Sequence, residues 1–168
     1  LGSIIGLQEL DVSRNRLDGP IPLELAEIGK SDCIFSLNSN RLSGTIPPEL
    51  GSMNSWTLAE LNLQNNQLSG PIPPGLGNNK RLRVLTLHNN QISGTIPPQL
   101  GSSVGLAELQ LHINRLTGPI PPEVGSLSAL SDLKISNTFL SGTLPPEVGS
   151  LSGLAFMDMH NNQLYGPR

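Results

Sequence analysis

The stretch LRVLTLHNNQISGTIPPQLG, from Leu82 to Gly101, decides the fold because close copies of it recur along the chain. Apolar residues fall at unit positions 1, 4, 6, 11, 15 and 19, with asparagine at 9, glycine at 13 and proline at 16. A fixed period of 20–29 residues predicts a solenoid in which each repeat packs on its neighbours. The units begin at Leu7, Asp32, Leu58, Leu82, Leu106, Leu130 and Leu154, and the last five starts are 24 residues apart.

Each unit predicts one short strand followed by a turn. In Leu85-Thr86-Leu87 the side chains alternate, so we expect the leucines to point into the core and Thr86 to point outward. The asparagine at unit position 9 is expected to turn inward and satisfy backbone groups where the strand bends. The sixth unit has Thr138 at this position, which predicts a weaker link between repeats there.

Composition and charge exclude several functions. The net charge of -3 gives no electrostatic basis for binding nucleic acid or an anionic membrane. The chain has no apolar run of about 18 residues, so we expect no membrane contact by this segment. Cys33 is the one cysteine and is interpreted as a buried apolar group. We find no pattern that predicts a cofactor, a nucleophilic triad or a phosphate-binding loop, and therefore expect no enzyme.

The motif LxxLxLxxNxLSGxIPxxLG resembles the plant-type leucine-rich repeat. The resemblance implies an α/β-type repeat solenoid: right-handed and curved, with a parallel concave sheet, short second strands and 3₁₀ helices on the convex side. The copies that carry it are Leu17–Pro22, Leu42–Pro47, Leu68–Pro73, Ile92–Pro97, Leu116–Pro121 and Leu140–Pro145.

We expect residues 1–168 to form one leucine-rich repeat domain. It would contain about six full repeats, starting at residues 7, 32, 58, 82, 106 and 130, with partial units at 1–6 and 154–168. Both ends are expected to be truncated, because no polar cap precedes or follows the repeats.

Unit positions 3, 5, 7 and 8 are expected to face outward on the concave sheet, where a solenoid binds its partners. They carry six carboxylates against Arg14 and Lys134, which favours a basic or polar ligand. Ile113 and Phe156 are candidate apolar anchors. The predicted partner-binding residues are Glu60, Asn62, Gln64, Val84, Thr86, His88, Glu108, Gln110, His112, Ile113, Asp132, Lys134, Phe156, Asp158 and His160.

All three histidines fall at unit position 7, with His88 and His112 expected as neighbours and Ser136 between them and His160. A metal site or a pH-sensitive contact is one interpretation. The other is a solvated polar row, which we favour because two histidines without a third ligand bind metal weakly.

The resemblance implies a protein- or peptide-binding module of a receptor-like kinase or receptor-like protein, extracellular or at the cell surface, with a possible co-receptor. A kinase domain would then lie outside this segment. A secreted inhibitor of a cell-wall-degrading enzyme, similar to the polygalacturonase inhibitors, is the alternative. A remote third possibility is ice binding, from the hydroxyl side chains at unit positions 12 and 14. The chain has no Asn-x-Ser/Thr glycosylation acceptor, although related extracellular domains usually carry several, so a microbial or algal source stays open.

Overall fold

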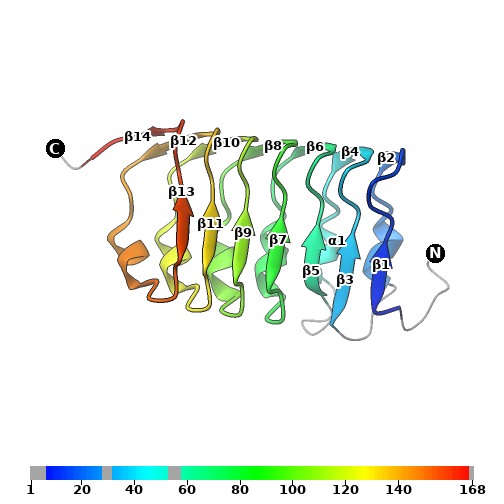
Figure 1. Ribbon diagram of the computed structural model, residues 1–168, viewed down its shortest axis with the longest axis horizontal. Coiled ribbons are helices and arrows are strands. Elements are labelled where there is room, and N and C mark those ends of the chain that lie inside the picture. Colours follow the sequence, from blue (N-terminus) through cyan, green and yellow to red (C-terminus); the bar gives the residue numbers. More distant parts are fainter. Residues whose placement is uncertain (1–6, 28–31, 53–57, 167–168) are drawn as a thin grey trace.

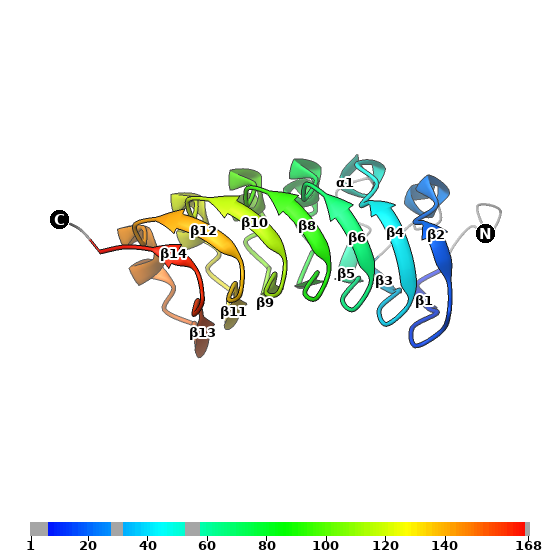
Figure 2. The same cartoon turned by 90° about the horizontal axis from the view of Figure 1, so that it is seen from above.

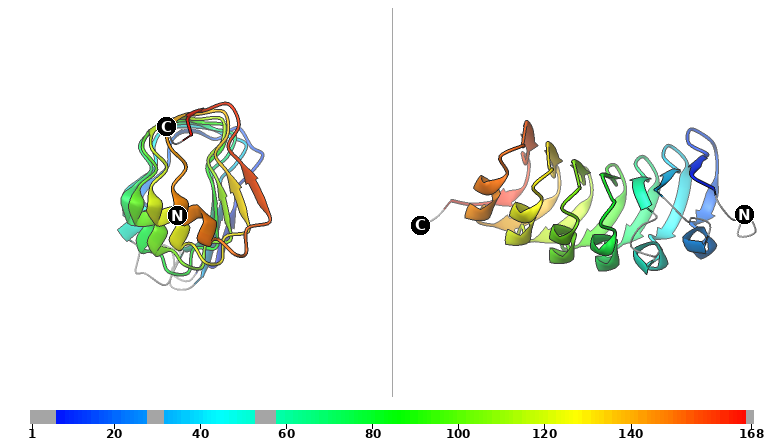
Figure 3. Two further views of the ribbon diagram at one scale, coloured as in Figure 1. Left: turned by 90° about the vertical axis from the view of Figure 1, so that its left-hand side faces the viewer. Right: turned by 90° about the horizontal axis from the view of Figure 1, so that it is seen from below.

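The computed structural model of the chain describes residues 7–27, 32–52 and 58–166. Within these residues, two seven-stranded parallel sheets and a row of short helices run along an elongated stack (Figure 1). The stack is curved, with the first sheet on its inner side and the helices on its outer side (Figure 2). Viewed along the stack, the two sheets and the helices surround a common interior (Figure 3). This arrangement confirms the predicted solenoid.

The first sheet forms the concave face and contains one short strand from each repeat. Neighbouring strands keep one register along the sheet, so residues at the same unit position pair with each other. A register shift between Cys33 and Ile34 is an irregularity in the second repeat. The strands are β1 (Glu9–Asp11), β3 (Cys33–Ser36), β5 (Leu58–Asn62), β7 (Val84–Thr86), β9 (Glu108–Gln110), β11 (Asp132–Lys134) and β13 (Phe156–Asp158).

The second sheet is formed by the turn segments, each of which contains the glycine at unit position 13. Gly118 illustrates why glycine is needed there: its φ is +77°, and an added Cβ would lie 2.9 Å from Cγ2 of Thr95. The strands are β2 (Asp18–Pro20), β4 (Arg41–Thr45), β6 (Gln67–Gly70), β8 (Gln91–Gly94), β10 (Arg115–Gly118), β12 (Phe139–Gly142) and β14 (Gln163–Leu164).

Short helices follow the proline turns and line the convex side. They pack closely because glycine occupies unit position 20, and a Cβ added to Gly101 would lie 2.3 Å from the carbonyl oxygen of Glu123. The 3₁₀ helices are η1 (Leu23–Glu27), η2 (Pro74–Asn78), η3 (Pro98–Ser102), η4 (Pro122–Ser126) and η5 (Pro146–Ser150). In the second repeat the corresponding turn is the α-helical α1 (Glu49–Ser52). No helix in the described ranges is long and apolar enough to cross a membrane.

The leucines and isoleucines of the repeat form one continuous core, as predicted. Leu109 is 0% exposed, and Cys33 is also fully buried, with its Sγ 3.2 Å from the carbonyl oxygen of Leu7. Asp32 takes the place of a leucine in the second repeat and is exposed, where it pairs with Arg81 at 3.2 Å. Asp32 in place of a leucine predicts a loosened stack around residues 26–35, and residues 28–31 of that range lie outside the described part.

The asparagines at unit position 9 link each repeat to the one before it. Asn114 is 6% exposed, and its amide donates to the carbonyl oxygens of Leu87 and Leu111, both at 3.0 Å. Its side-chain oxygen accepts the N–H of Ile92 at 2.9 Å, so one side chain satisfies three backbone groups. The predicted inward orientation of these asparagines is therefore confirmed.

Thr138 cannot make the same link to the preceding repeat. Its hydroxyl lies 3.3 Å from the carbonyl oxygen of Ile135, in its own repeat, and 2.5 Å from Oδ1 of Asn162, in the following one. Because threonine has no amide, the carbonyl of Leu111 receives no hydrogen bond from this side chain, and the N–H of Leu116 finds no amide oxygen here to which it could donate. The structure thus supplies the physical reason for the weaker link predicted here.

Candidate functional site

The register of the first sheet brings the predicted binding residues into rows. At unit position 3, Glu60 pairs with Val84, Val84 with Glu108, Glu108 with Asp132, and Asp132 with Phe156. The row at unit position 5 aligns in the same way. It contains Asp11, Ser36, Asn62, Thr86, Gln110, Lys134 and Asp158.

Two neighbouring strands, β9 and β11, carry a cluster of polar side chains. Nε2 of Gln110 donates to Oε1 of Glu108 at 2.6 Å and to Oδ2 of Asp132 at 3.3 Å. Nζ of Lys134 donates to the same Oδ2 at 3.0 Å. These contacts hold two carboxylates side by side, so their positions are set before any partner binds.

The two carboxylates of this cluster are not electrically equivalent. Burial raises the pKa of Glu108, and the negative charges of Asp132 and Glu60 raise it further against the opposing charge of Lys134. Oδ1 of Asp132 is buried and has no hydrogen-bond partner, which leaves an acceptor oxygen unsatisfied. The partly exposed carboxylates of Glu108 and Asp132 present negative charge on the concave face, which a positively charged group of a partner can complement.

Phe156 is the last residue of the row at unit position 3, on the terminal strand β13. Its ring is 51% exposed, and Nζ of Lys134 lies 5.1 Å from the ring centre, within the range of a cation–π contact. Val84, by contrast, is partly buried between the strands that carry Glu60 and Glu108. Of these two apolar residues, Phe156 offers the larger free surface.

Thr86 differs from its prediction as a partner-contacting residue. Its side chain lies on the concave side but is only 4% exposed, because its neighbours cover it. Its Oγ1 lies 2.8 Å from Oδ1 of Asn62 and 2.7 Å from Oε1 of Gln64. Thr86 therefore orients these two amides, which are themselves partly exposed.

The histidine row divides into two parts. His88 and His112 stack with ring centres 4.2 Å apart and planes 11° from parallel, which confirms that they are neighbours. Burial, together with the positive charges of His112 and Lys134, lowers the pKa of His88 to about 4. Burial also lowers the pKa of His112, so both rings are neutral at pH 7. The Nδ1 atoms of both rings are buried without a partner.

His160 belongs to a separate network at the C-terminal end of the sheet. Its Nδ1 lies 2.5 Å from Oδ1 of Asp158, and its Nε2 lies 3.1 Å from Nδ2 of Asn137. Burial opposes ionisation of Asp158, but hydrogen bonds from His160 and Ser136 outweigh it and lower the pKa of this carboxyl group. Ser136 is 1% exposed and acts as a support beneath the network.

These histidines do not assemble a metal centre. In the described ranges, no group of three or more histidine, cysteine, aspartate or glutamate side chains is placed to hold a metal ion. The parallel stack of His88 and His112 also directs their ring nitrogens side by side, whereas two ligands of one ion must point toward a common centre. This geometry favours the interpretation of a polar row.

Sequence reasoning missed the structural role of unit position 8. Its residues have left-handed backbone conformations, with φ between 53° and 59°. Two pairs form side-chain hydrogen bonds across the sheet: Asn89 donates to Asn65 at 2.8 Å, and Asn161 donates to Asn137 at 2.9 Å. The recurrence of asparagine at this position was the available signal, because asparagine tolerates this conformation.

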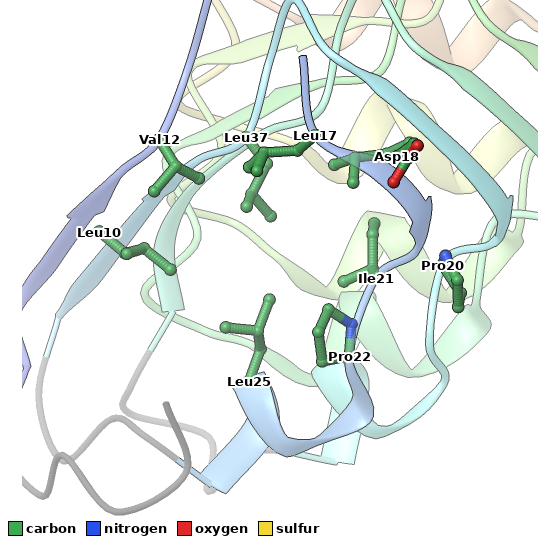
Figure 4. A pocket seen from close by; sticks show the side chains of 10 residues that line it. Leu10, Val12, Leu17, Asp18, Pro20, Ile21, Pro22, Leu25 and Leu37 are labelled. Atoms are coloured by element: carbon green, nitrogen blue, oxygen red, sulfur yellow. The ribbon is translucent and has the colours of Figure 1, made fainter. Parts of the chain in front are cut away.

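An apolar cavity of about 290 Å³ lies away from the concave side chains, at the end of the core nearest β1 and β2 (Figure 4). Leu10, Ile21, Leu25 and Leu37 are among the residues that line it. They occupy the same unit positions as buried leucines and isoleucines of the later repeats. The cavity is therefore a continuation of the core and not part of the concave site.

Comparisons with solved structures place the chain beside plant receptor ectodomains. It is 34% identical to the plant peptide hormone receptor RGFR1, solved with RGF2, with a TM-score of 0.92 over 97% of this chain and 26% of that chain. It is 36% identical to the Arabidopsis receptor kinase HAESA, solved with the peptide hormone IDA and the co-receptor SERK1, with a TM-score of 0.87 over 94% of this chain and 26% of that chain. The chain thus spans about a quarter of each of these two proteins.

A plant ice-binding protein is also similar: 30% identity and a TM-score of 0.74, over 94% of this chain and 50% of that chain. The same fold therefore occurs with different functions. A comparison with curated proteins found no match.

The leucine-rich repeat family model matches residues 6–28, 33–53, 57–79 and 81–103, which is more than half of the chain. The sheets, the convex 3₁₀ helices and the asparagine links described above agree with that match. The chain therefore belongs to the leucine-rich repeat family, in its plant-type form.

Proposed function

We propose that this chain is a recognition module that binds a protein or peptide on its concave face. It would form part of the extracellular or cell-surface domain of a receptor-like kinase or receptor-like protein that acts in signalling or defence. We further propose that residues 1–168 are one continuous repeat domain. In this role the chain binds and does not catalyse, and a co-receptor would join the complex that it forms with its ligand.

The observation that carries this proposal is the ordered arrangement of polar side chains on the first sheet. Gln110 and Lys134 form hydrogen bonds with the carboxylate of Asp132, and Ser136 and His160 form hydrogen bonds with the carboxylate of Asp158. A surface whose side chains are already held in place loses less conformational entropy when a partner binds. The similarity to receptor ectodomains solved with peptide hormones supports the choice of ligand class.

A selection from a displayed library of random peptides tests this proposal. We expect enriched peptides whose binding weakens by roughly tenfold or more in Glu108→Lys, Phe156→Ala and His112→Ala, as truncation of an interface anchor does. Glu147→Lys makes the same charge change as Glu108→Lys at an exposed position of η5 and should leave binding unchanged. If the three concave variants bind the enriched peptides as the wild type does, the concave face is not the binding surface.

A secreted inhibitor of a cell-wall-degrading enzyme would use the same face. The two proposals differ in the partner, since an inhibitor binds a folded polygalacturonase and abolishes its activity. Addition of the purified chain to a polygalacturonase assay distinguishes them. Inhibition that is lost in Glu108→Lys would favour the inhibitor over the receptor module.

Ice binding is a third candidate because of the similarity to a plant ice-binding protein. It would use hydroxyl side chains at the end of the second-sheet strands, where Thr45 ends β4 and Thr95 and Thr143 directly follow β8 and β12; all three are exposed. Pro71 and Pro119, which directly follow the intervening strands β6 and β10, take the place of threonine in alternate repeats, so the hydroxyl row is interrupted. An ice-recrystallisation assay checks this candidate, and activity that survives Glu108→Lys but is lost in Thr95→Val would favour it.

A further inference from the structure

Ile113 stands in a backbone conformation that its side chain disfavours. Its φ is +54°, in the left-handed region, where a β-branched residue is a rare outlier. Three of its counterparts in other repeats, Asn89, Asn137 and Asn161, have nearly the same φ and the side chain that tolerates it best. The repeat therefore imposes this conformation, and Ile113 departs from the residue that suits it.

The backbone of Ile113 is held on both sides. Its N–H donates to the carbonyl oxygen of Ser136 at 3.1 Å, and its carbonyl oxygen accepts the N–H of Asn90 at 3.2 Å. Relaxing φ would break hydrogen bonds to both neighbouring repeats. The strain is therefore maintained by the fold and is not removed by a local adjustment.

Core packing does not compensate for this strain. The side chain of Ile113 is 47% exposed, so it contributes little to the buried core. It also interrupts the amide contacts of its row, where Asn89 donates to Asn65 at 2.8 Å and Asn161 donates to Asn137 at 2.9 Å. A residue that costs stability and packs against little is a candidate for a binding role.

The surroundings of Ile113 indicate what it would bind. It directly follows His112, whose ring stacks on that of His88, so two flat rings and one aliphatic side chain occupy adjacent positions of two repeats. The outward positions of the whole concave sheet carry six carboxylates against Arg14 and Lys134, an excess of negative charge. An apolar contact within a negative surface fits a partner that is positively charged overall.

We propose that Ile113, together with the stacked pair His88 and His112, forms the seat for an apolar side chain of a peptide that carries net positive charge. This inference rests on the proposed function and specifies the chemistry of its ligand. Ile113 contacts the apolar side chain directly, and the two imidazole rings extend the contact. The negative charge of the surrounding face attracts the peptide and disfavours acidic sequences.

The test uses the random-peptide selection with Ile113→Asn, a substitution that suits the backbone. Ile113→Asn relieves the strain and allows an amide contact to Asn89, so the midpoint of thermal unfolding should rise by roughly 2–4 °C. Binding of the enriched peptides should fall by about tenfold. A role that is only structural would not combine higher stability with weaker binding.

Two further variants are the controls. Ile113→Val keeps a branched apolar side chain in the same conformation and should retain most of the binding. Asn89→Ile creates an equally strained residue in the preceding repeat, and should lower the unfolding temperature without improving the affinity. The enriched peptides themselves should combine apolar residues with lysine or arginine, and replacement of those basic residues by glutamate should abolish binding.

The outcomes separate this inference from the proposed function. If the enriched peptides lose binding in Glu108→Lys but bind Ile113→Asn as they bind the wild type, the concave face is the binding surface and the role of Ile113 is refuted. An enrichment of acidic peptides refutes the charge preference. If the selection yields no peptide that depends on the concave face, both proposals are overturned.

Discussion

Replacing Thr138 by asparagine should strengthen the link between the fifth and sixth repeats. Asn114 shows what the substitution adds: its amide reaches Leu87 in the preceding repeat at 3.0 Å, and its oxygen accepts the N–H of Ile92 at 2.9 Å. The equivalent groups for position 138 are the carbonyl of Leu111 and the N–H of Leu116. The variant thus gains two hydrogen bonds between repeats.

The substitution also removes a contact, because the hydroxyl of Thr138 now lies 2.5 Å from Oδ1 of Asn162. That oxygen keeps the N–H of Leu140 as a donor at 3.0 Å. The net gain is one hydrogen bond, worth about 1 kcal/mol in the free energy of unfolding. For a chain of this size, that corresponds to a rise of roughly 2–4 °C in the midpoint of thermal unfolding.

Urea denaturation followed by circular dichroism measures the effect, and an increase in midpoint with an unchanged slope identifies a change in stability. Asn114→Thr is the matched reversal and should lower stability by about 1 kcal/mol or more. Thr138→Val removes the hydroxyl without adding an amide and should not stabilise. If Thr138→Asn leaves the midpoint unchanged or lowers it, the asparagine links do not hold the repeats together as argued.

Three other perturbations test separate parts of the structure. Gly101→Ala should lower the free energy of unfolding by about 1–3 kcal/mol, because the added Cβ would lie 2.3 Å from a backbone oxygen. Gly149→Ala is the control: its added Cβ would have nothing within 4 Å, so it should have almost no effect in the same denaturation assay. Leu109→Ala should cost about 2–5 kcal/mol, since this side chain is 0% exposed; a loss below 1 kcal/mol would contradict the described core. His88 is kept neutral in the folded state, where its pKa is about 4, while the unfolded chain takes up a proton near pH 6.5. Its contribution to stability is therefore full above pH 6.5 and is lost as the pH falls toward 4. The free energy of unfolding of His88→Asn should consequently depend less on pH between pH 6.5 and pH 4 than that of the wild type. An identical pH dependence would refute the assignment of a lowered pKa to His88.

The sequence predicted the features that depend on the repeat period. Leu109 was expected in the core and Asn114 at the bend because each recurs at a fixed unit position, and the structure confirms both. The pairing of His88 with His112 followed from the same register. Periodicity predicts such features because the hydrogen bonds of a parallel sheet align equivalent residues.

The remaining features depend on what neighbouring side chains do. Thr86 points to the concave side as expected but is buried, because the amides of Asn62 and Gln64 close over it. The partners of His160 come from its own repeat and from Asn137, and no spacing rule selects them. The left-handed conformation of Ile113 follows from the geometry of the turn. Periodicity did not predict it, because a repeat period indicates which way a side chain faces and does not indicate the backbone φ.

The glycines at unit position 20 affect the concave face from the opposite side of the molecule. At Gly77, Gly101 and Gly125 the helices of adjacent repeats approach so closely that a single methyl group would meet backbone atoms. The strand spacing on the inner side is fixed by hydrogen bonds, at about 4.8 Å. A larger residue at these glycines would thus widen only the outer side and bend the arc more tightly. The curvature of the surface that meets a ligand is therefore adjustable by substitutions that no ligand touches.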